Sequence, residues 1–249
     1  MSSQDTGPHV VVVIPTLNEK EATATIVERL DSLRPQQVSH HISVLYVDGG
    51  SGDGTLELLN TLTEQYAWLH LIRQSDKRGL GAAYAEGMNY AMSELKADFI
   101  LEFDGDLQHN PDDIPQFLKY TEGYDYVIGT RFIDGGSIPD DWGLDRILLS
   151  KGGNLIARLA LGAHHLHDIT SGFKLSRVKG FLEEFDFSRL YSKRHAYKIH
   201  LLAFMLQRGA RVKEVPIEFQ AREAGESKLI KNDIVDTLRV LSLIRLKGV

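Results

Sequence analysis

The sequence predicts an α/β fold in which a mostly parallel sheet is flanked by helices. In the first half of the chain, short runs rich in β-branched residues alternate with segments of helical periodicity, which is typical of successive β-α-β units. The first run, Val10 to Ile14, is entirely apolar, as expected for a strand that is covered on both faces. No repeat, low-complexity run or clear linker divides the 249 residues, so we expect a single globular domain.

The first half contains five predicted strands and the helices that connect them. The strands are expected over residues 10–14, 42–47, 68–73, 97–103 and 124–129. The first helix is expected to end near residue 33, and later helices to cover residues 54–65, 81–95 and 112–120. Asn18 and Glu21 have the spacing of a capping box for the first helix. Ala83, Gly87 and Ala91 recur every four residues, which suits close packing of their helix on the sheet.

The second half begins with residues 134–143, which are rich in Gly, Pro and Asp and are expected to form a mobile loop. Helices are then expected over residues 148–161, 177–184 and 195–208, followed by a strand pair within 212–219. A last helical pattern, over 229–246, combines a wide apolar face with Lys and Arg side chains. We therefore expect a domain over residues 1–228 and a basic amphipathic helix over 229–249, which lies in a membrane interface or packs on the domain.

Composition excludes several classes of protein. The absence of Cys excludes a disulfide framework, a thiolate zinc site and a cysteine nucleophile. A net charge of −6 argues against a general nucleic-acid binder, which needs clustered positive charge. No run reaches the roughly 18 apolar residues of a membrane-spanning helix, and the N-terminus lacks a signal pattern. We expect a cytoplasmic protein whose membrane contact, if any, is peripheral.

The charge is unevenly distributed along the chain. Residues 1–188 carry 15 basic and 28 acidic side chains, whereas residues 189–249 carry 13 basic and 6 acidic ones. The acidic body suits a bound cation, and the basic C-terminal part suits a diphosphate or an anionic membrane surface.

Polar clusters follow three of the predicted strands. These clusters span residues 15–19, 48–55 and 104–108. Because open α/β sheets bind ligands outside the carboxyl ends of their strands, we expect the clusters to converge on one edge. Asp48 stands directly at a strand end, where it is suited to hydrogen-bond a base or ribose, while Asp53 or Thr55 is expected to cap the next helix.

Asp104 and Asp106 flank Gly105 directly after an apolar strand. This spacing lets two carboxylates approach one hard cation, and Gln108 can add a neutral oxygen. The sequence therefore predicts a Mg²⁺ or Mn²⁺ site, with a solvated acidic turn as the alternative. His109, next to the acidic pair, is the nearest imidazole, and a lone histidine at a turn is more often a supporting or exposed group than a ligand.

Eight sequence blocks occur in order along the chain. They are P-T-x-N-E (15–19), V-D-x-x-S-x-D-G-T (47–55), G-L-G-x-A-Y (79–84), D-x-D-L-Q-H-x-P (104–111), G-T-R (129–131), S-K-G-G-N (150–154), D-x-T-S-G-F (168–173) and G-E-S-K-L (225–229). From Val10 to about Lys228 the chain thereby resembles the family 2 glycosyltransferases of the GT-A (Rossmann-like) fold, and among them the dolichyl- and polyprenyl-phosphate mannose synthases.

The resemblance implies an inverting transfer of a hexose, mannose from GDP-mannose above all, to the phosphate of a long isoprenoid lipid. It implies that the nucleotide-sugar donor is bound by Pro15, Glu19, Asp48, Asp104, Gly105, Asp106, Arg222 and Lys228. It further implies a Mg²⁺ or Mn²⁺ ion on Asp104, Asp106 and Gln108, and an acceptor phosphate on Arg131, Arg146 and Ser150. Asp106 and Arg131 are then the residues closest to the chemistry.

The lack of an obvious catalytic base agrees with this chemistry. A lipid phosphate is already anionic at neutral pH, so catalysis reduces to alignment and neutralisation of charge. For Arg131 and Arg146, the alternative is a surface ion pair with acids of the 134–145 loop. Leu17 and Gly49 depart from residues that are common in the family at the nucleoside pocket, so the base and sugar remain open.

The sequence leaves three alternative functions. The first is a related transferase that uses UDP-glucose or another nucleotide sugar. The second is a nucleotidyltransferase, which would normally carry a Gly-rich basic loop where this chain has P-T-L-N-E. The third is a non-catalytic nucleotide-sugar-binding protein, against which the retention of Asp104, Asp106, Gln108, Arg131 and Arg222 argues. Access to the lipid requires peripheral membrane binding or the help of a small membrane partner protein.

Overall fold

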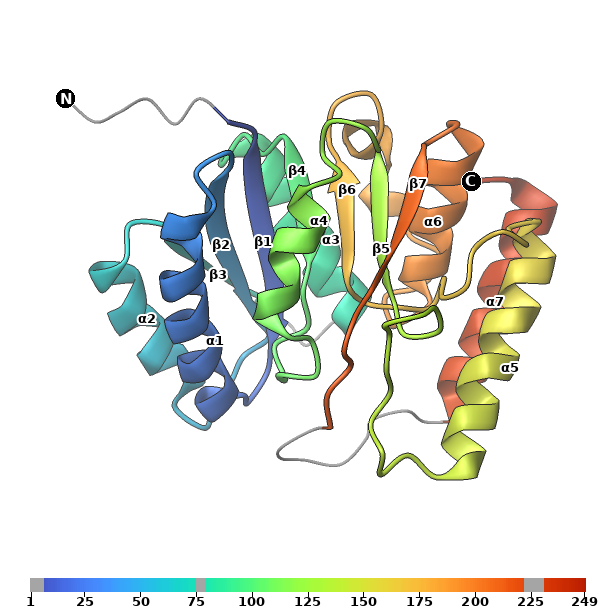
Figure 1. Cartoon of the computed structure of the whole chain (residues 1–249), viewed down its shortest axis with the longest axis horizontal. Helices are drawn as coiled ribbons and strands as arrows, with labels where there is room; N and C mark the ends of the chain where they lie inside the picture. The colour runs from blue at the N-terminus through green and yellow to red at the C-terminus, as the bar shows by residue number, and fades with distance from the viewer. Residues whose placement is uncertain (1–6, 75–78, 222–230) are drawn as a thin grey trace.

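The computed structural model describes residues 7–74, 79–221 and 231–249, with side chains of the last range from residue 233 onward. Within these residues, seven strands form one sheet in the order β3-β2-β1-β4-β6-β5-β7 (Figure 1). The strands are β1 (His9–Thr16), β2 (His41–Asp48), β3 (Leu69–Arg73), β4 (Phe99–Glu102), β5 (Tyr126–Thr130), β6 (Lys174–Arg177) and β7 (Val212–Pro216). All pairs are parallel except those of β6 with β4 and β5, which confirms the mostly parallel sheet.

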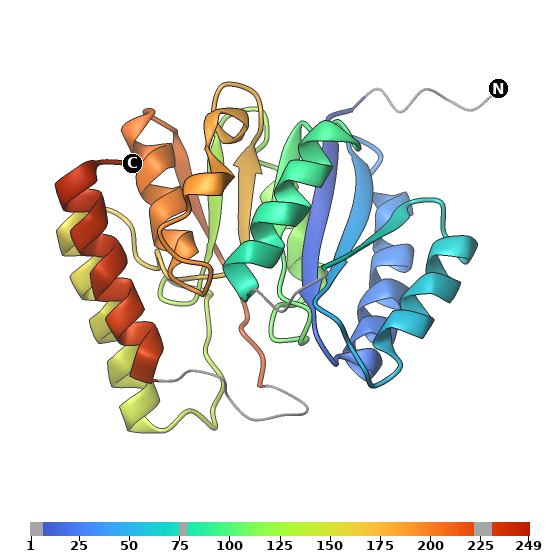
Figure 2. The same cartoon turned by 180° about the vertical axis from the view of Figure 1, so that it is seen from behind.

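Helices cover both faces of this sheet (Figures 1 and 2). The α-helices are α1 (Lys20–Leu33), α2 (Thr55–Gln65), α3 (Leu80–Ser93), α4 (Ile114–Leu118), α5 (Leu144–Leu161), α6 (Tyr197–Gln207) and α7 (Lys231–Lys247), and the 3-10 turns are η1 (Arg34–Gln36), η2 (Pro111–Asp113), η3 (Leu182–Glu184) and η4 (Phe187–Arg189). The helices α3 and α6 share one face, while α1, α2 and α4 share the other. The helices α5 and α7 run side by side at the β7 end of the sheet.

The uniformly apolar β1 is buried on both faces, as its sequence predicts. Val11 and Val13 pack in the core under α3 and α6, whereas Val10, Val12 and Ile14 pack in the core under α1. Alternate strand residues point to opposite faces, so both cores need apolar side chains from the same strand.

The predicted close packing of α3 on the sheet is confirmed at Gly87. A Cβ atom there would lie 2.6 Å from Val13 and 2.8 Å from Val47. Ala83 and Ala91 are buried on the same helix face. These small residues bring the α3 backbone close to β1 and β2.

Two predicted elements of the second half are wrong. The helix expected over 177–184 is instead the end of β6 followed by the single turn η3. The strand pair expected within 212–219 is one strand, β7, whose partner is the distant β5, and Glu218 adds only an isolated bridge to Ser137. Both errors arise because strand pairing joins residues far apart in the chain, which local periodicity does not reveal.

The expected capping box is also wrong, and the N-cap of the second helix is Gly54 rather than Asp53 or Thr55. Asn18 has a positive φ of 57°, and its side-chain oxygen accepts the N–H of Gly52 rather than one from the first turn of α1. The carboxylate of Asp53 accepts the N–H of Thr55, the first residue of α2.

Among the described residues, no helix is long and apolar enough to cross a membrane.

Candidate active site

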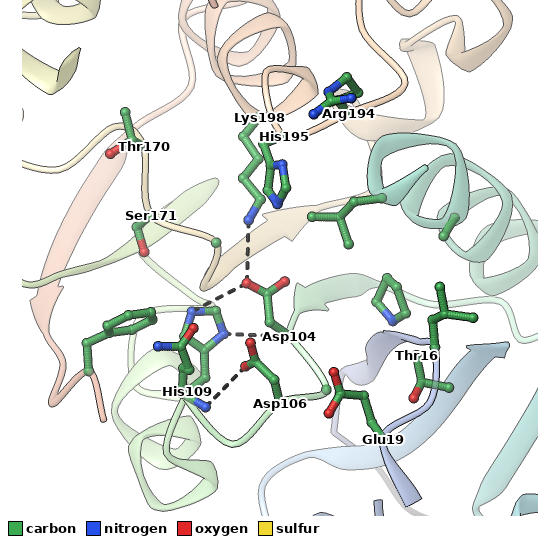
Figure 3. Close-up of a pocket in the computed structure, with 18 of the residues that line it drawn as sticks. Thr16, Glu19, Asp104, Asp106, His109, Thr170, Ser171, Arg194, His195 and Lys198 are labelled. Atoms are coloured by element: carbon green, nitrogen blue, oxygen red, sulfur yellow. Dashed lines mark hydrogen bonds and ion pairs between the residues drawn. The ribbon is translucent and has the colours of Figure 1, made fainter. Parts of the chain in front are cut away.

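A cavity of about 700 Å³ opens at the carboxyl ends of β1, β4 and β5 (Figure 3). Eight residues predicted for the site line it: Pro15, Glu19, Asp104, Gly105, Asp106, Gln108, Arg131 and Arg146. Gly105 permits the close approach of the segments after β1 and β4, since a Cβ atom there would lie 3.0 Å from the carbonyl oxygen of Pro15. The segments after these strands therefore meet at the edge where open α/β sheets bind ligands.

The carboxylate of Asp104 is held by side chains from three separate parts of the chain. Its Oδ1 accepts the hydroxyl proton of Tyr84, on α3, at 2.8 Å. Its Oδ2 lies 3.6 Å from Nζ of Lys198, on α6, and 3.9 Å from Nε2 of His109. Burial alone would raise the pKa of Asp104, but the ammonium group of Lys198 and the hydrogen bond from Tyr84 hold it well below its usual range. Asp104 is therefore ionised throughout the physiological pH range.

His109 supports Asp104 and is neutral. Its ring is buried, and its Nδ1 accepts the backbone N–H of Asp104 at 3.1 Å. The ring proton consequently sits on Nε2, the nitrogen that faces the Asp104 carboxylate. Burial lowers the pKa of His109. With Nδ1 occupied, His109 is a supporting residue for the Asp104 turn.

The turn that carries Asp106 is fixed by the backbone. Leu107 adopts a left-handed conformation with φ 61°, and its buried side chain anchors the turn in the core. The backbone N–H of Gln108 donates to Oδ1 of Asp106 at 3.2 Å. The side-chain Nε2 of Gln108 donates to the backbone carbonyl of Gln220 at 3.3 Å. This places the Asp106 carboxylate at the cavity wall beside Asp104 (Figure 3).

The donor set around Asp104 and Asp106 fits a hard divalent ion that takes its other ligands from a substrate. Two carboxylates and the amide of Gln108 line the cavity together. Within the described ranges, no group of three or more His, Cys, Asp or Glu side chains could enclose a metal. Mg²⁺ and similar ions usually bind through one or two carboxylates plus substrate phosphates, so this sparse set suits them.

Arg131 forms a two-pronged ion pair with Asp168 rather than with acids of the 134–145 loop. Its Nε and Nη2 donate to the two carboxylate oxygens at 2.7 and 2.9 Å, and Nη2 also donates to Thr170 at 3.3 Å. The backbone N–H of Asp168 in turn donates a hydrogen bond to the carboxylate of Glu214 on β7. The guanidinium is surrounded by the rings of Phe132, Trp142 and Phe219. Burial alone would raise the pKa of Asp168, but Arg131 keeps it below its usual value.

Arg131 keeps donors for a ligand despite this pairing. An arginine has five N–H donors, and in the part of the chain that the structure describes the two on Nη1 make no hydrogen bond. Arg146 lies nearby, with its guanidinium 4.1 Å from the ring centre of Trp142. Ser150, one turn further along α5, does not line the cavity.

Three further predicted residues have other outcomes. Asp48 ends β2 and is buried, and its Oδ1 accepts the N–H groups of Gly50 and Ser51 at 3.0 and 3.1 Å. It does not line the cavity, although its neighbour Gly49 does. Arg222 and Lys228 lie outside the described residues.

Lys198, His195 and the role of Tyr84 are not predicted from the sequence. Lys198 and His195 line the cavity wall opposite Thr16 and Glu19 (Figure 3). A signal for Lys198 was present, because apart from His200 it stands in an apolar stretch of α6, where a charged side chain is rarely buried without a reason.

The sequence profile of glycosyl transferase family 2 matches residues 11–185 of the chain. A polyprenol monophosphomannose synthase of Mycolicibacterium smegmatis is 35% identical over 92% of this chain and 83% of its own length. An undecaprenyl-phosphate mannosyltransferase of Micrococcus luteus is 34% identical over 88% of this chain and 87% of its own. A dolichol-phosphate mannosyltransferase of Pyrococcus furiosus is 32% identical over 96% of this chain, which spans 64% of that relative.

Solved structures confirm the fold. Glucosyl-3-phosphoglycerate synthase of Mycobacterium tuberculosis, in complex with Mn²⁺, UDP and glucosyl-3-phosphoglycerate, superposes with a TM-score of 0.63 at 17% identity over 98% of this chain and 82% of that one. Mannosyl-3-phosphoglycerate synthase of Rubrobacter xylanophilus gives a TM-score of 0.64 at 17% identity over 97% and 75%. With the profile and these relatives spanning most of its length, the chain belongs to glycosyl transferase family 2.

Proposed function

We propose that the protein transfers a mannosyl residue from GDP-mannose to the phosphate of a polyprenyl or dolichyl phosphate, with inversion at the anomeric carbon. The observation that carries most weight is the similarity, over nearly the whole chain, to relatives named as a polyprenol monophosphomannose synthase and an undecaprenyl-phosphate mannosyltransferase. The cavity supports it, because one space is lined both by the acidic pair Asp104 and Asp106 and by the cations Arg131 and Arg146. A donor diphosphate and an acceptor phosphate can therefore meet there.

On the donor side, we propose that Asp104, Asp106 and Gln108 hold a Mg²⁺ or Mn²⁺ ion. When bound, this ion would offset the charge that develops on the leaving nucleoside diphosphate. Pro15 and Glu19 line the cavity where the nucleoside would lie. We also propose that Asp48 positions the loop that follows β2 for binding of the nucleoside. Arg222 and Lys228 are proposed to bind the diphosphate.

On the acceptor side, the nucleophile is an oxygen of the lipid phosphate. Because this group is anionic at neutral pH, no residue has to remove a proton. The bond from this oxygen to the anomeric carbon forms as the bond to the leaving diphosphate breaks on the opposite face. The free Nη1 donors of Arg131, with Arg146, would align the phosphate and offset its repulsion by the donor. Ser150, one turn after Arg146 on α5, does not line the cavity but is proposed to bind the same phosphate.

We further propose that the protein binds peripherally to the cytoplasmic face of a membrane through an apolar surface on α5 and α7. This α5–α7 surface consists of Leu144, Leu148, Leu149, Leu155, Ile156, Leu159, Ile234, Val235, Leu238 and Leu246, and all ten are exposed. Elsewhere in the described residues, Val38 is the one other exposed large hydrophobic side chain. Basic groups of α5 and α7, including Lys151, Arg239 and Arg245, would attract anionic lipid headgroups.

The helix α7 reconciles the two arrangements expected for the C-terminal segment. Val240 and Leu241 are buried against the domain, whereas Ile234, Val235 and Leu238 face outward. One side of the helix therefore docks on the protein and leaves the other side for a membrane or for a small membrane partner protein.

The transfer is tested by incubating the purified protein with a panel of nucleotide sugars, Mg²⁺ or Mn²⁺, and a short polyprenyl phosphate. We expect a mannosylated lipid phosphate from GDP-mannose, detected by mass spectrometry, and no product with the matching polyprenol, which lacks the phosphate. A product from UDP-glucose alone would overturn the donor assignment. If no donor yields a glycolipid, the lipid acceptor is wrong.

A further inference from the structure

Lys198 places a nearly buried ammonium group at the cavity wall. Its side chain is 7% exposed, and Nζ faces Oδ2 of Asp104 at 3.6 Å, which is longer than a hydrogen bond. In the described part of the chain, this ammonium donates no hydrogen bond, although it carries three N–H donors. Buried donors without acceptors are costly, so the position indicates that oxygen atoms of a ligand meet Lys198 in the cavity.

The surrounding chain holds Lys198 in this position. The hydroxyl of the neighbouring Tyr197 donates to the buried carboxylate of Glu102 on β4, which fixes the start of α6 beneath the site. Gly172 keeps space open at the same point. A Cβ atom there would overlap Nζ of Lys198 and would lie 2.7 Å from Oδ2 of Asp104. A side chain in place of this glycine would therefore disturb the Lys198–Asp104 pair directly.

The chemistry of the pair distinguishes between a phosphate and a hydroxyl as its ligand. Because Nζ of Lys198 lies only 3.6 Å from Oδ2 of Asp104, a phosphate oxygen placed directly against Lys198 would meet this carboxylate oxygen with no metal ion between them, and the two anions would repel each other. A hydroxyl group can accept a hydrogen bond from Lys198 and donate one to Asp104 at the same time. The pair therefore favours a neutral polyol.

We propose that Lys198, together with Asp104, binds hydroxyl groups of the hexose of the nucleotide-sugar donor and so contributes to sugar specificity. Figure 3 shows the Lys198 amine directed at the Asp104 carboxylate, with Asp106 on the far side of it. The pair thus shares Asp104 with the metal site proposed for the diphosphate and lies on the side of Asp104 away from Asp106, as a sugar joined to that diphosphate requires. This inference rests on the proposed function, which supplies the nucleotide-sugar donor.

The test compares binding of the sugar nucleotide with binding of the nucleotide diphosphate alone. Lys198→Met keeps the length of the side chain and removes its charge and donors. With Mn²⁺ present, we expect it to weaken GDP-mannose binding by about 10- to 100-fold, as for the loss of a hydrogen bond from a charged group. Binding of GDP should change by less than about twofold. Lys179→Met, which changes an exposed lysine beyond the opposite end of β6, serves as the matched control.

Equal weakening of GDP-mannose and GDP would show that Lys198 faces the diphosphate and would overturn the proposal. Unchanged binding of both would overturn it too, since Lys198 would then only hold Asp104. Unimpaired GDP binding also shows that the variant is folded. If the wild-type protein binds UDP-glucose rather than GDP-mannose, the donor assignment fails, and the same comparison with UDP-glucose and UDP still tests Lys198.

Donor analogues that each lack one hydroxyl provide a second measurement. The wild type should bind at least one analogue about 10-fold more weakly than the parent donor, and Lys198→Met should show no further loss for that analogue. If the variant and the wild type are equally sensitive to every analogue, Lys198 does not contact the sugar.

Discussion

Asp104 and Asp106 are two residues apart, yet their surroundings differ. Asp104 is held by Tyr84, Lys198 and His109, while Asp106 stands at the tip of the turn. If Asp106 contacts the divalent ion, Asp106→Asn should lower kcat by about 100-fold or more, because charge stabilisation of the leaving group is lost. Steady-state kinetics with Mg²⁺ or Mn²⁺ measures this.

Asp112→Asn is the matched control for Asp106→Asn, since Asp112 lies in η2, in the same connection between β4 and α4, but is exposed in a surface ion pair with Arg29. We expect this control to retain activity within a few-fold. Turnover by Asp106→Asn within a few-fold of the wild type would contradict the assignment of Asp106.

The ion pair between Arg131 and Asp168 should also contribute to the stability of the fold. Asp168 is fully buried, so Arg131→Ala leaves an uncompensated buried carboxylate and should lower the free energy of unfolding by about 3–5 kcal/mol. Urea denaturation measures the loss. Arg131→Ala/Asp168→Ala should recover part of it, because the unpaired charge is gone. A double variant no more stable than Arg131→Ala would argue against the charge as the cause.

At this scale the sequence predicts which residues line the cavity better than it predicts their partners. Pro15, Glu19, the turn from Asp104 to Gln108 and Arg131 gather as expected, because each follows a strand of one sheet, whereas Asp48 does not line the cavity. The partners Asp168 of Arg131 and Lys198 of Asp104 are not apparent from the sequence, since they lie 37 and 94 residues away in the chain. Only the fold brings such pairs together.

At the scale of elements, the first five strands and their helices are predictable because each β-α-β unit is local in sequence. The antiparallel β6 is not, because its four residues, Lys174–Arg177, carry a buried lysine and lack an apolar run. The early start of α5, at Leu144 rather than residue 148, follows from a first turn that is exposed and gives no periodic signal.

The contact of α3 with the sheet depends on Gly87. Gly87→Ala should lower the free energy of unfolding by about 1–3 kcal/mol, because the added methyl group overlaps Val13 and Val47. Gly153→Ala in α5 is the control, since nothing lies within 4 Å of a Cβ atom there. The control should be neutral or stabilising by about 0.5–1 kcal/mol. Urea unfolding of both variants measures the difference, and equal effects would contradict the packing argument.

The molecule as a whole should lose stability in mild acid. Burial lowers the pKa of several histidines, among them His9, His70 and His195, and lowers that of His200 to about 4. The unfolded chain then binds protons at a higher pH than the folded chain. Burial raises the pKa of Asp113 to about 6, which acts in the opposite direction, but the four histidines outnumber it. The free energy of unfolding should therefore level off between about pH 7.5 and 8 and fall as the pH drops through about 6.5 towards 4.

Urea unfolding at pH 8, 6.5 and 5 measures this dependence. His200→Gln should reduce the slope, whereas His164→Gln, which changes an exposed histidine, should leave it unchanged. A free energy of unfolding that stays level from pH 8 to pH 5 would refute the prediction.

The α5–α7 surface predicts how the whole molecule meets a membrane. Leu148→Glu/Leu238→Glu places a charge on each helix of this surface and should abolish sedimentation with anionic vesicles. Turnover of a short, water-soluble acceptor should persist, because neither residue lines the cavity. Val38→Glu is the control, since Val38 is 92% exposed on another surface. Equal vesicle binding by both variants would contradict this role.

The reversed strand β6 sets the distance between the two halves of the site. It separates β4, which ends at the Asp104 turn, from β5, which ends at Arg131. Neighbouring strands lie about 4.8 Å apart, so the two strand ends are about 10 Å from each other. The backbone of the sheet thus fixes the spacing between the positions proposed for the donor and for the acceptor. A change in the loops around the cavity would leave this spacing unaltered.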